Sequence, residues 1–517
     1  MKKLCYFVLA SLLTIFSLAA GLLLLPLQPA PFMAQNGPFA IERVNVVNVE
    51  SGAIDHAVTV LVDGGEIVDI LPAEEYRENP YFKAIPADNQ YLIPGLWDMH
   101  THSLKISPQI HHPLFIANGV TAARDLSGCM SREDSYWACI DDRIRWTNEA
   151  LAGTRVAPRY ILQSSYQTNG GNEVPDAYPS YFRLKTKADA NALVMFYKSV
   201  GADFIKVYSE LSLDQYLNLA ATAKANGVDI AGHKPIVVPL LTAIESGQRS
   251  IEHARLFLFE CFEGIGEFRS LEDPIGHYTP QLMWEMLAQQ DEQECRQLMA
   301  AMGDSDTWWV PTLTTLRMSA YAREPGFRAD SRLESVPFIV KNLLWYPDAD
   351  RAATRGYSDT GEYVHHDFYA RALSHVNTAN QHGVKLLAGT DVGDTYVFAG
   401  SGLHDELSML VDSGLSPLEA LRSATIGAAL FSRLEDEFGS VEIGKAADIV
   451  LLQNNPLEDI NNVRGIVGVM QNGHFYDQAA IDALQAFVVR QAGSLQVNLR
   501  HLWDALYSPL MRKQLAD

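Results

Sequence analysis

A long middle section, in which short apolar strands alternate with helices, most constrains the fold of this chain. Helical patterns lie between the strands, for example over residues 213–220. Parallel strands need crossover connections of a dozen or more residues, usually helices, so this alternation predicts a parallel α/β fold. The predicted buried strands are 119–125, 159–162, 203–208, 228–231 and 385–388.

Short β-like segments flank this middle on both sides. On the N-terminal side, Asp63-Gly64-Gly65 separates two apolar runs and predicts a hairpin. On the C-terminal side, two further apolar runs precede an Asn472-Gly473 turn. We therefore expect both flanks to contribute strands to one small β-sandwich domain.

The length of 517 residues exceeds what one hydrophobic core usually needs. A (β/α)₈ TIM barrel takes roughly 250 residues and grows past 400 with insertions, so one barrel and a companion domain account for the chain. Between the barrel strands, Trp, Tyr, Pro and charged residues crowd a segment that predicts an insertion. The expected boundaries are a signal anchor at 1–30, the β-sandwich at 38–92 and 438–478, the barrel at 93–437 with an insertion at about 256–380, and a helical tail at 479–517.

The formal net charge of −22 excludes a nucleic-acid-binding role for the chain as a whole. Phosphate recognition needs a basic surface, and an acidic balance mainly favours solubility. The charge does not identify a substrate.

The N-terminus predicts export. Lys2 and Lys3 precede an apolar run from Leu4 to Leu27. About 20 apolar residues span a bilayer core, whereas a signal peptide has a shorter apolar region and a small-x-small cleavage site. No good cleavage site follows Leu27, so we expect an uncleaved membrane anchor, with a cleaved signal peptide as the alternative. The lysines then stay in the cytoplasm, and the folded body of the chain lies on the periplasmic side.

Four cysteines lie outside the apolar run that contains Cys5. An even number of cysteines in an exported domain favours disulfides. Proximity in sequence suggests the pairs Cys129–Cys139 and Cys261–Cys295, while four free buried thiols have equal weight at this stage.

His100 and His102 begin the candidate metal site. Residues two apart on a strand point to the same face, so both imidazoles can bind one metal ion at the end of a strand. The preceding apolar run, Tyr91 to Met99, predicts that strand.

The segment from Leu92 to His102, LIPGLWDMHTH, resembles the first-strand motif of the amidohydrolase superfamily, nearest to its imidazolonepropionase-like and prolidase-like branch. The segments 414–421 and 439–450 are similar to that family as well, and the resemblance covers about residues 40–478. It implies a TIM barrel with a composite β domain and a metal-dependent hydrolase.

The resemblance also implies a ligand set. A lysine desolvated at a strand end is driven toward its neutral amine, which can add carbon dioxide and then bridge two cations. Imidazole and carboxylate ligands favour Zn²⁺. The expected ligands are His100, His102 and Asp391 for the first metal, His233 and His253 for the second, and carboxylated Lys206 as the bridge.

The chemistry implied is hydrolysis of a C–N bond, in an amide or dipeptide-like small molecule, by a metal-activated bridging water. Asp391 would accept the proton from water and deliver it to the leaving nitrogen. Tyr208, on the same strand face as Lys206, would assist substrate binding. The alternatives are hydrolysis of a cyclic amide, lactone or ester at the same site, or a non-catalytic scaffold. The oligomeric state stays open, a homo-oligomer included.

One departure from the prolidase-like pattern concerns specificity. The loop after the third strand reads Thr168-Asn169-Gly170-Gly171-Asn172, with Asn172 where those relatives often have histidine. This difference puts carboxypeptidase specificity in question.

Overall fold

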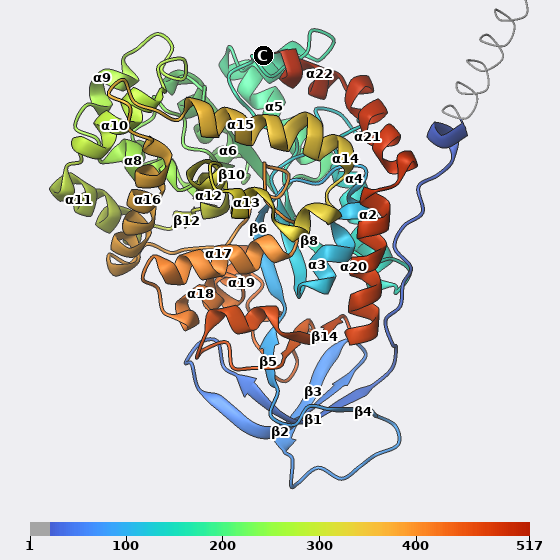
Figure 1. Cartoon of the computed structure of the whole chain (residues 1–517). Helices are drawn as coiled ribbons and strands as arrows, with labels where there is room; N and C mark the ends of the chain where they lie inside the picture. Colours follow the sequence, from blue (N-terminus) through green and yellow to red (C-terminus); the bar gives the residue numbers. More distant parts are fainter. Residues whose placement is uncertain (1–20, 517) are drawn as a thin grey trace, which may run out of the picture.

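The computed structural model describes residues 21–516 (Figure 1). The predicted anchor lies mostly outside this range. Among the described residues, no helix has the length and apolarity needed to cross a bilayer.

Seven short parallel strands form the centre of the molecule. Three are hydrogen-bonded in the order β6-β7-β8 and four in the order β12-β11-β10-β9. Apart from a few partly exposed residues, these strands are buried, as expected for strands covered by helices. Their bounds are β6 Leu96–Thr101, β7 Val120–Asp125, β8 Arg159–Gln163, β9 Phe204–Val207, β10 Asp229–Gly232, β11 Gln248–Glu252 and β12 Trp308–Val310.

Backbone hydrogen bonds join the two groups of strands into a TIM-barrel-like arrangement. Thr168 N–H donates to Lys206 O at 2.9 Å, which joins the end of β8 to β9. Leu387 N–H donates to Trp309 O at 2.9 Å, and Asp391 N–H donates to His100 O at 2.8 Å. The extended segment 385–391 therefore lies between β12 and β6. The predicted parallel α/β fold is confirmed.

A mixed sheet, drawn below the barrel in Figure 1, contains strands from both flanks of the chain. Its order is β15-β14-β13-β5-β1-β2-β3, with β4 paired to β1. These strands share one continuous hydrogen-bonded sheet with its own apolar core, and two register shifts interrupt the pairing of β1 with β2. The bounds are β1 Phe39–Val47, β2 Ile54–Asp63, β3 Glu66–Pro72, β4 Lys83–Pro86, β5 Tyr91–Pro94, β13 Ile449–Leu452, β14 Ile466–Gln471 and β15 His474–Asp477.

Helices surround the wall of the barrel and cover one of its ends. Capping boxes start α5 at Thr186 and α6 at Ser212, and both helices pack their apolar faces inward. The predicted insertion region forms several short helices around β12. The main helices are α5 Lys187–Val200, α6 Leu213–Ala225, α8 Arg255–Glu260, α10 Pro280–Ala288, α11 Glu292–Gly303, α12 Leu313–Tyr321, α14 Phe338–Val340, η3 Lys341–Trp345, α15 Tyr346–Arg355, α16 Val364–Gln381 and α17 Ser401–Asp412.

The C-terminal residues form three helices along one side of the barrel: α20 Gln478–Ala492, α21 Leu495–Tyr507 and α22 Pro509–Ala516 (Figure 1). The first of these helices, α20, packs against α3, His112–Ala117, which contacts β7.

Two disulfides join the cysteine pairs suggested by proximity. The Cα atoms of Cys129 and Cys139 are 5.3 Å apart, and those of Cys261 and Cys295 are 4.8 Å apart. The first bridge closes the loop after β7, and the second joins the end of α8 to α11. The predicted pairing is confirmed.

Candidate metal centre

All six predicted ligand residues lie at the carboxyl ends of barrel segments, where TIM-barrel enzymes place their active sites. His100 belongs to β6, and Lys206 belongs to β9. The other four follow a strand or extended segment by one or a few residues. They are His102 after β6, His233 after β10, His253 after β11 and Asp391 after segment 385–388.

Asp391 contacts three of the predicted histidines. Its Oδ1 lies 2.8 Å from His102 Nε2 and 3.3 Å from His100 Nε2, and its Oδ2 lies 3.7 Å from His253 Nδ1. Burial opposes ionisation of this carboxyl, but His100 and His102 hold its pKa well below the usual range. The side chain is therefore a carboxylate, as a metal ligand requires.

The imidazoles of His233 and His253 face each other. Their Nε2 atoms are 2.7 Å apart, so at most one of the two nitrogens carries a proton. The opposite ring nitrogens are already engaged: His233 Nδ1 contacts Ser209 Oγ at 2.7 Å, and His253 Nδ1 contacts Thr312 Oγ1 at 2.8 Å. Burial lowers the pKa of both histidines, that of His253 to about 3, which keeps both rings neutral.

Lys206 is almost completely buried beside these histidines. Burial lowers the pKa of its ammonium from 10.5 to about 8, although Asp391 and Glu252 oppose the shift. Its Nζ lies 5.4 Å from the centre of the Tyr208 ring. A substantial neutral fraction near physiological pH is the condition for carboxylation by carbon dioxide.

The backbone is strained at two of these positions. Asp391 has φ of 65° and His253 has φ of 76°, in the left-handed region that non-glycine residues rarely adopt. Such conformations cost about 1–3 kcal/mol each and are concentrated at functional sites. At these two residues the backbone leaves the strand direction, which turns both side chains toward the centre of the site.

A buried charged network behind His100 was missed at the sequence level. Glu252 Oε2 accepts a hydrogen bond from His100 Nδ1 at 2.9 Å, and Arg124 Nη2 donates to both Glu252 oxygens at 2.9 Å. Burial opposes ionisation of Glu252, but Arg124 and His100 lower its pKa to about 2. This fixes the His100 tautomer, so that the lone pair of Nε2 points into the site. That Nε2 is buried and has no hydrogen-bond partner among the described residues.

Asp98 positions the turn that carries Asp391. Its two oxygens accept from the backbone N–H of Thr390 at 2.9 Å and from the Thr390 hydroxyl at 2.6 Å. The signal for this role was present in the sequence, because Asp98 and His100 are two apart in one strand motif.

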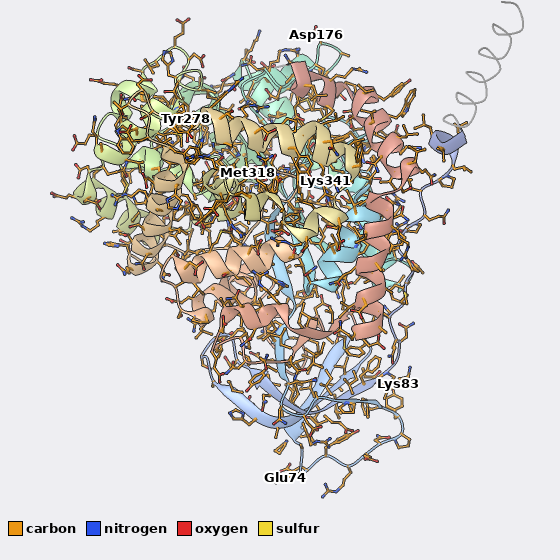
Figure 2. All side chains as sticks on the ribbon, viewed as in Figure 1. Glu74, Lys83, Asp176, Tyr278, Met318 and Lys341 are labelled. Carbon is orange, nitrogen blue, oxygen red and sulfur yellow. A yellow bond between two sulfur atoms is a disulfide. The ribbon has the colours of Figure 1, made fainter. Side chains whose placement is uncertain are left out.

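Two cavities meet at the site. The first, of about 310 Å³, is lined by five of the ligand residues. The second, of about 250 Å³, shares His233 and His253 with the first and continues past Arg255 to apolar side chains. Tyr208 lines both cavities, and its ring centre lies 3.9 Å from that of His233. The apolar lining of the second cavity consists of Ile236, Leu256, Phe259, Ile275 and Tyr278, the last of which Figure 2 labels.

Asn172 lies away from these cavities. It is exposed, and its side-chain amide donates to Glu210 Oε2 at 2.9 Å. It lines neither cavity. The group that recognises a substrate carboxylate, if the substrate has one, must therefore come from elsewhere.

Known proteins resemble this chain in sequence over one segment and in fold over most of its length. The Amidohydrolase family profile matches residues 368–475. The comparison with curated protein sequences found no match. The fold is similar to that of a bottromycin amidohydrolase, with a TM-score of 0.67, 22% identity and coverage of 88% of this chain and 91% of that one.

Two further solved structures are similar. A prolidase-like protein from Bifidobacterium longum has a TM-score of 0.57 and 20% identity, with 87% of this chain and 99% of that one covered. A Xaa-Pro dipeptidase with bound methionine has a TM-score of 0.59 and 21% identity, with 85% and 100% covered.

Proposed function

We propose that the chain is an amidohydrolase-type enzyme that hydrolyses an amide or dipeptide-like small molecule with the help of two divalent metal ions. The family profile over residues 368–475 and the similar folds of an amidohydrolase and a dipeptidase support this proposal. The observation that carries this proposal is the convergence of six ligand-type side chains at the carboxyl ends of the barrel strands, five of which line one cavity. We also propose that the barrel has the full (β/α)₈ form, with segment 385–391 as its eighth strand.

The side chains suit metal ions. The buried Nε2 of His100, which lies 3.3 Å from Asp391 Oδ1, the opposed Nε2 atoms of His233 and His253, and the carboxylate of Asp391 are groups that bind a divalent ion once deprotonated. We assign His100, His102 and Asp391 to one ion, His233 and His253 to the other, and carboxylated Lys206 to both. Zn²⁺ is the expected ion, since nitrogen and carboxylate oxygen ligands suit it. When bound, the ions would supply an acidified water and polarise the substrate carbonyl.

Residues of the chain itself carry out proton transfer and substrate binding. Asp391 Oδ1 accepts the proton of the attacking water and returns it to the leaving nitrogen, since it points into the cavity beside the ligand histidines. Tyr208 lines both cavities, and its hydroxyl donates a hydrogen bond to the substrate. Burial raises the pKa of Tyr208 to about 12, so the hydroxyl keeps its proton at neutral pH. The second cavity receives an apolar part of the substrate.

Arg255 is the best candidate to bind an acidic group of the substrate. It lines both cavities, and none of the ion pairs among the described residues includes it. An amide whose leaving part carries both a carboxylate and an apolar side chain would place the first on Arg255 and the second against Phe259 and Tyr278. The methionine bound in the dipeptidase relative has both groups.

The test combines metal removal with a substrate screen. Purified full chain should contain close to two metal ions, lose its activity on chelation and regain it with Zn²⁺. N-acyl amino acids and dipeptides should be hydrolysed faster than a parallel set of lactones, esters and cyclic amides. Preference for that second set would favour the alternative reaction, and protein without metal or any hydrolysis would favour the non-catalytic scaffold.

For its location we propose export with retention of the apolar N-terminal run as a membrane anchor. The two disulfides support an oxidising compartment. Cell fractionation with and without detergent tests the anchor: a mature protein that is released without detergent and lacks residues 1–30 would contradict it.

A further inference from the structure

Helix α21 buries polar side chains and exposes large apolar ones. Its inward positions include Asn498, His501 and Asp504, all buried. Two of these bind the rest of the fold: Asn498 Oδ1 accepts from Ile339 N–H at 2.9 Å, and Asp504 O accepts from the Ser135 hydroxyl at 2.8 Å. A surface helix ordinarily turns its apolar stripe inward.

The outward positions of α21 are large and apolar. Trp503 is 49% exposed and Tyr507 is 65% exposed, and the two rings stack with centroids 5.7 Å apart. Leu495, Leu502 and Leu506 are exposed on the same helix. Burying polar groups while exposing five such side chains lowers stability in water, so the arrangement indicates that something apolar covers α21.

The exposed apolar surface continues onto neighbouring elements. On one side, α14 contacts α21, and α14 and the following η3 expose Phe338, Leu343 and Leu344; Figure 2 labels Lys341 in the same segment. On the other side, the Gln496 and Arg500 side chains donate to Leu25 O at 3.0 Å and Leu23 O at 2.8 Å. The apolar residues of α21, α14, η3 and Leu24–Leu25 are called the α21 face below.

Two features identify what covers this face. First, the apolar run that begins at Leu4 ends at the α21 face, because Leu23 and Leu25 are hydrogen-bonded to α21. Second, α22, which packs beside α21, carries Arg512 and Lys513 and no acidic residue, whereas Arg500 and Asp504 of α21 pair with each other at 3.1 Å. Basic residues beside outward Trp, Tyr and Leu side chains are typical of segments that lie in the headgroup region of anionic membranes.

We propose that the α21 face lies in the surface of a lipid bilayer, with Trp503 and Tyr507 at the level of the headgroups. The N-terminal run and this face then contact the same membrane from adjacent points. The inference does not depend on the enzymatic proposal, because it uses no residue of the metal centre.

An apolar cavity lies between this face and the site. It has a volume of about 70 Å³, and its lining includes Leu344 of η3, Val340 of α14 and His501 of α21. Leu104, Tyr136 and Gly393 line both this cavity and the 310 Å³ cavity of the metal centre. Gln514 of α22 also lines the larger cavity. If the proposed function holds, the substrate is therefore an amide with an apolar chain that enters from the bilayer.

Local fluorescence quenching tests the docking. The full chain is reconstituted into vesicles of brominated phosphatidylcholine with phosphatidylglycerol, and the tryptophan emission is compared with that of Trp503→Phe. The chain has eight tryptophans, so the contribution of Trp503 is obtained by subtracting the emission of Trp503→Phe from that of the unmodified chain. The control is Trp308→Phe, in the barrel strand β12. We expect the quenched component to disappear in Trp503→Phe and to persist in Trp308→Phe. Equal quenching in both variants would overturn the proposal. The face would then be covered by something other than the bilayer, such as residues 4–20 or a second copy of the chain.

A charge substitution gives an independent readout. Leu502→Glu with Leu506→Glu should abolish the Trp503 quenching. Leu213→Glu with Leu217→Glu, an equally spaced and similarly exposed pair on α6, should leave it unchanged. Loss of quenching in both pairs, or in neither, would contradict a specific α21 face.

The substrate route has its own test. In vesicles, the Leu502/Leu506 pair should lower kcat/KM for a long-chain amide about tenfold or more, from the lost burial of two leucines, and leave a short water-soluble amide unaffected. Equal effects on both amides would refute the route. Absence of any hydrolysis would refute the proposed function, and the quenching result would stand.

Discussion

The two halves of the proposed metal centre are supported differently. His100 is hydrogen-bonded to a buried charged pair, Glu252 and Arg124, with distances of 2.9 Å throughout. Among residues 21–516, the hydrogen-bond partners behind His233 and His253 are the hydroxyls of Ser209 and Thr312. A charged chain fixes both the orientation and the basicity of its ligand, whereas a hydroxyl fixes mainly the orientation. We infer that the His100 half binds its ion more tightly than the His233 half.

The largest effect should come from the residue that joins the two halves. Lys206→Ala removes the bridge, and we expect kcat to fall at least about a thousandfold, since several kcal/mol of charge stabilisation are lost. A small carboxylic acid added to the variant should restore part of the activity by replacing the carbamate. Unchanged activity in Lys206→Ala would mean that the halves do not depend on a bridge.

Glu252→Gln should come next. The variant leaves Arg124 buried without a counter-charge, and breaking a buried pair in this way costs about 3–5 kcal/mol of unfolding free energy. Metal affinity at the His100 half should fall about 10- to 100-fold. Calorimetry with metal titration measures both quantities.

A second variant separates the two effects of Glu252. Arg124→Met combined with Glu252→Gln removes the uncompensated charge, so we expect much of the stability to return while metal affinity stays low. Recovery of affinity together with stability would show that Glu252 acts only through folding.

Thr312→Val should have a smaller effect, confined to the other half. The substitution keeps the branched shape and removes one neutral hydrogen bond, worth about 0.5–1.5 kcal/mol. We expect the second ion to bind about tenfold more weakly or less, and the first to be unaffected, as competition with a chelator would measure. A loss of metal affinity as large as that expected for Glu252→Gln would show that the two halves are supported equally.

The smallest effect concerns pH. Because burial lowers the pKa of Lys206 to about 8, the neutral amine should reach half its maximum near pH 8 in metal-free protein, far below the ordinary 10.5. Carbamate formation from ¹³C-labelled bicarbonate, followed by NMR, should rise across this range. The unfolded chain binds more protons between pH 8 and 10.5, so this lysine also makes the stability rise with pH over that window. A midpoint near 10.5 would contradict both statements.

The sequence predicts strands and turns far better than it predicts contacts between distant residues. Alternating apolar runs locate strands such as Glu66–Pro72, and Gly64-Gly65 marks the turn before it, because these signals are local. The pair of Arg124 and Glu252 joins residues 128 apart, and no local pattern contains it. Glu252 was also hidden by strand alternation, which places it opposite His253; the left-handed backbone at His253 brings both side chains to the site.

The sheet shared by the two flanks shows the same limit. Each strand could be predicted from its own residues, but the sheet to which it belongs depends on which edges meet. Strand β1 pairs with β5, more than 40 residues away, and β5 pairs with β13 in the other flank, and no local pattern contains these pairings.

The composite sheet also sets the order in which the chain can be completed during synthesis. Strand β5 pairs with β13, so Leu92 has no pairing partner until Leu451 leaves the ribosome, 359 residues later. Until then, the growing chain presents an open, apolar strand edge next to the first barrel strand. At about 5–20 residues per second this interval lasts roughly 20–70 seconds. A nascent chain of this kind needs protection from aggregation throughout that time, and a product truncated before β13 would never close the edge.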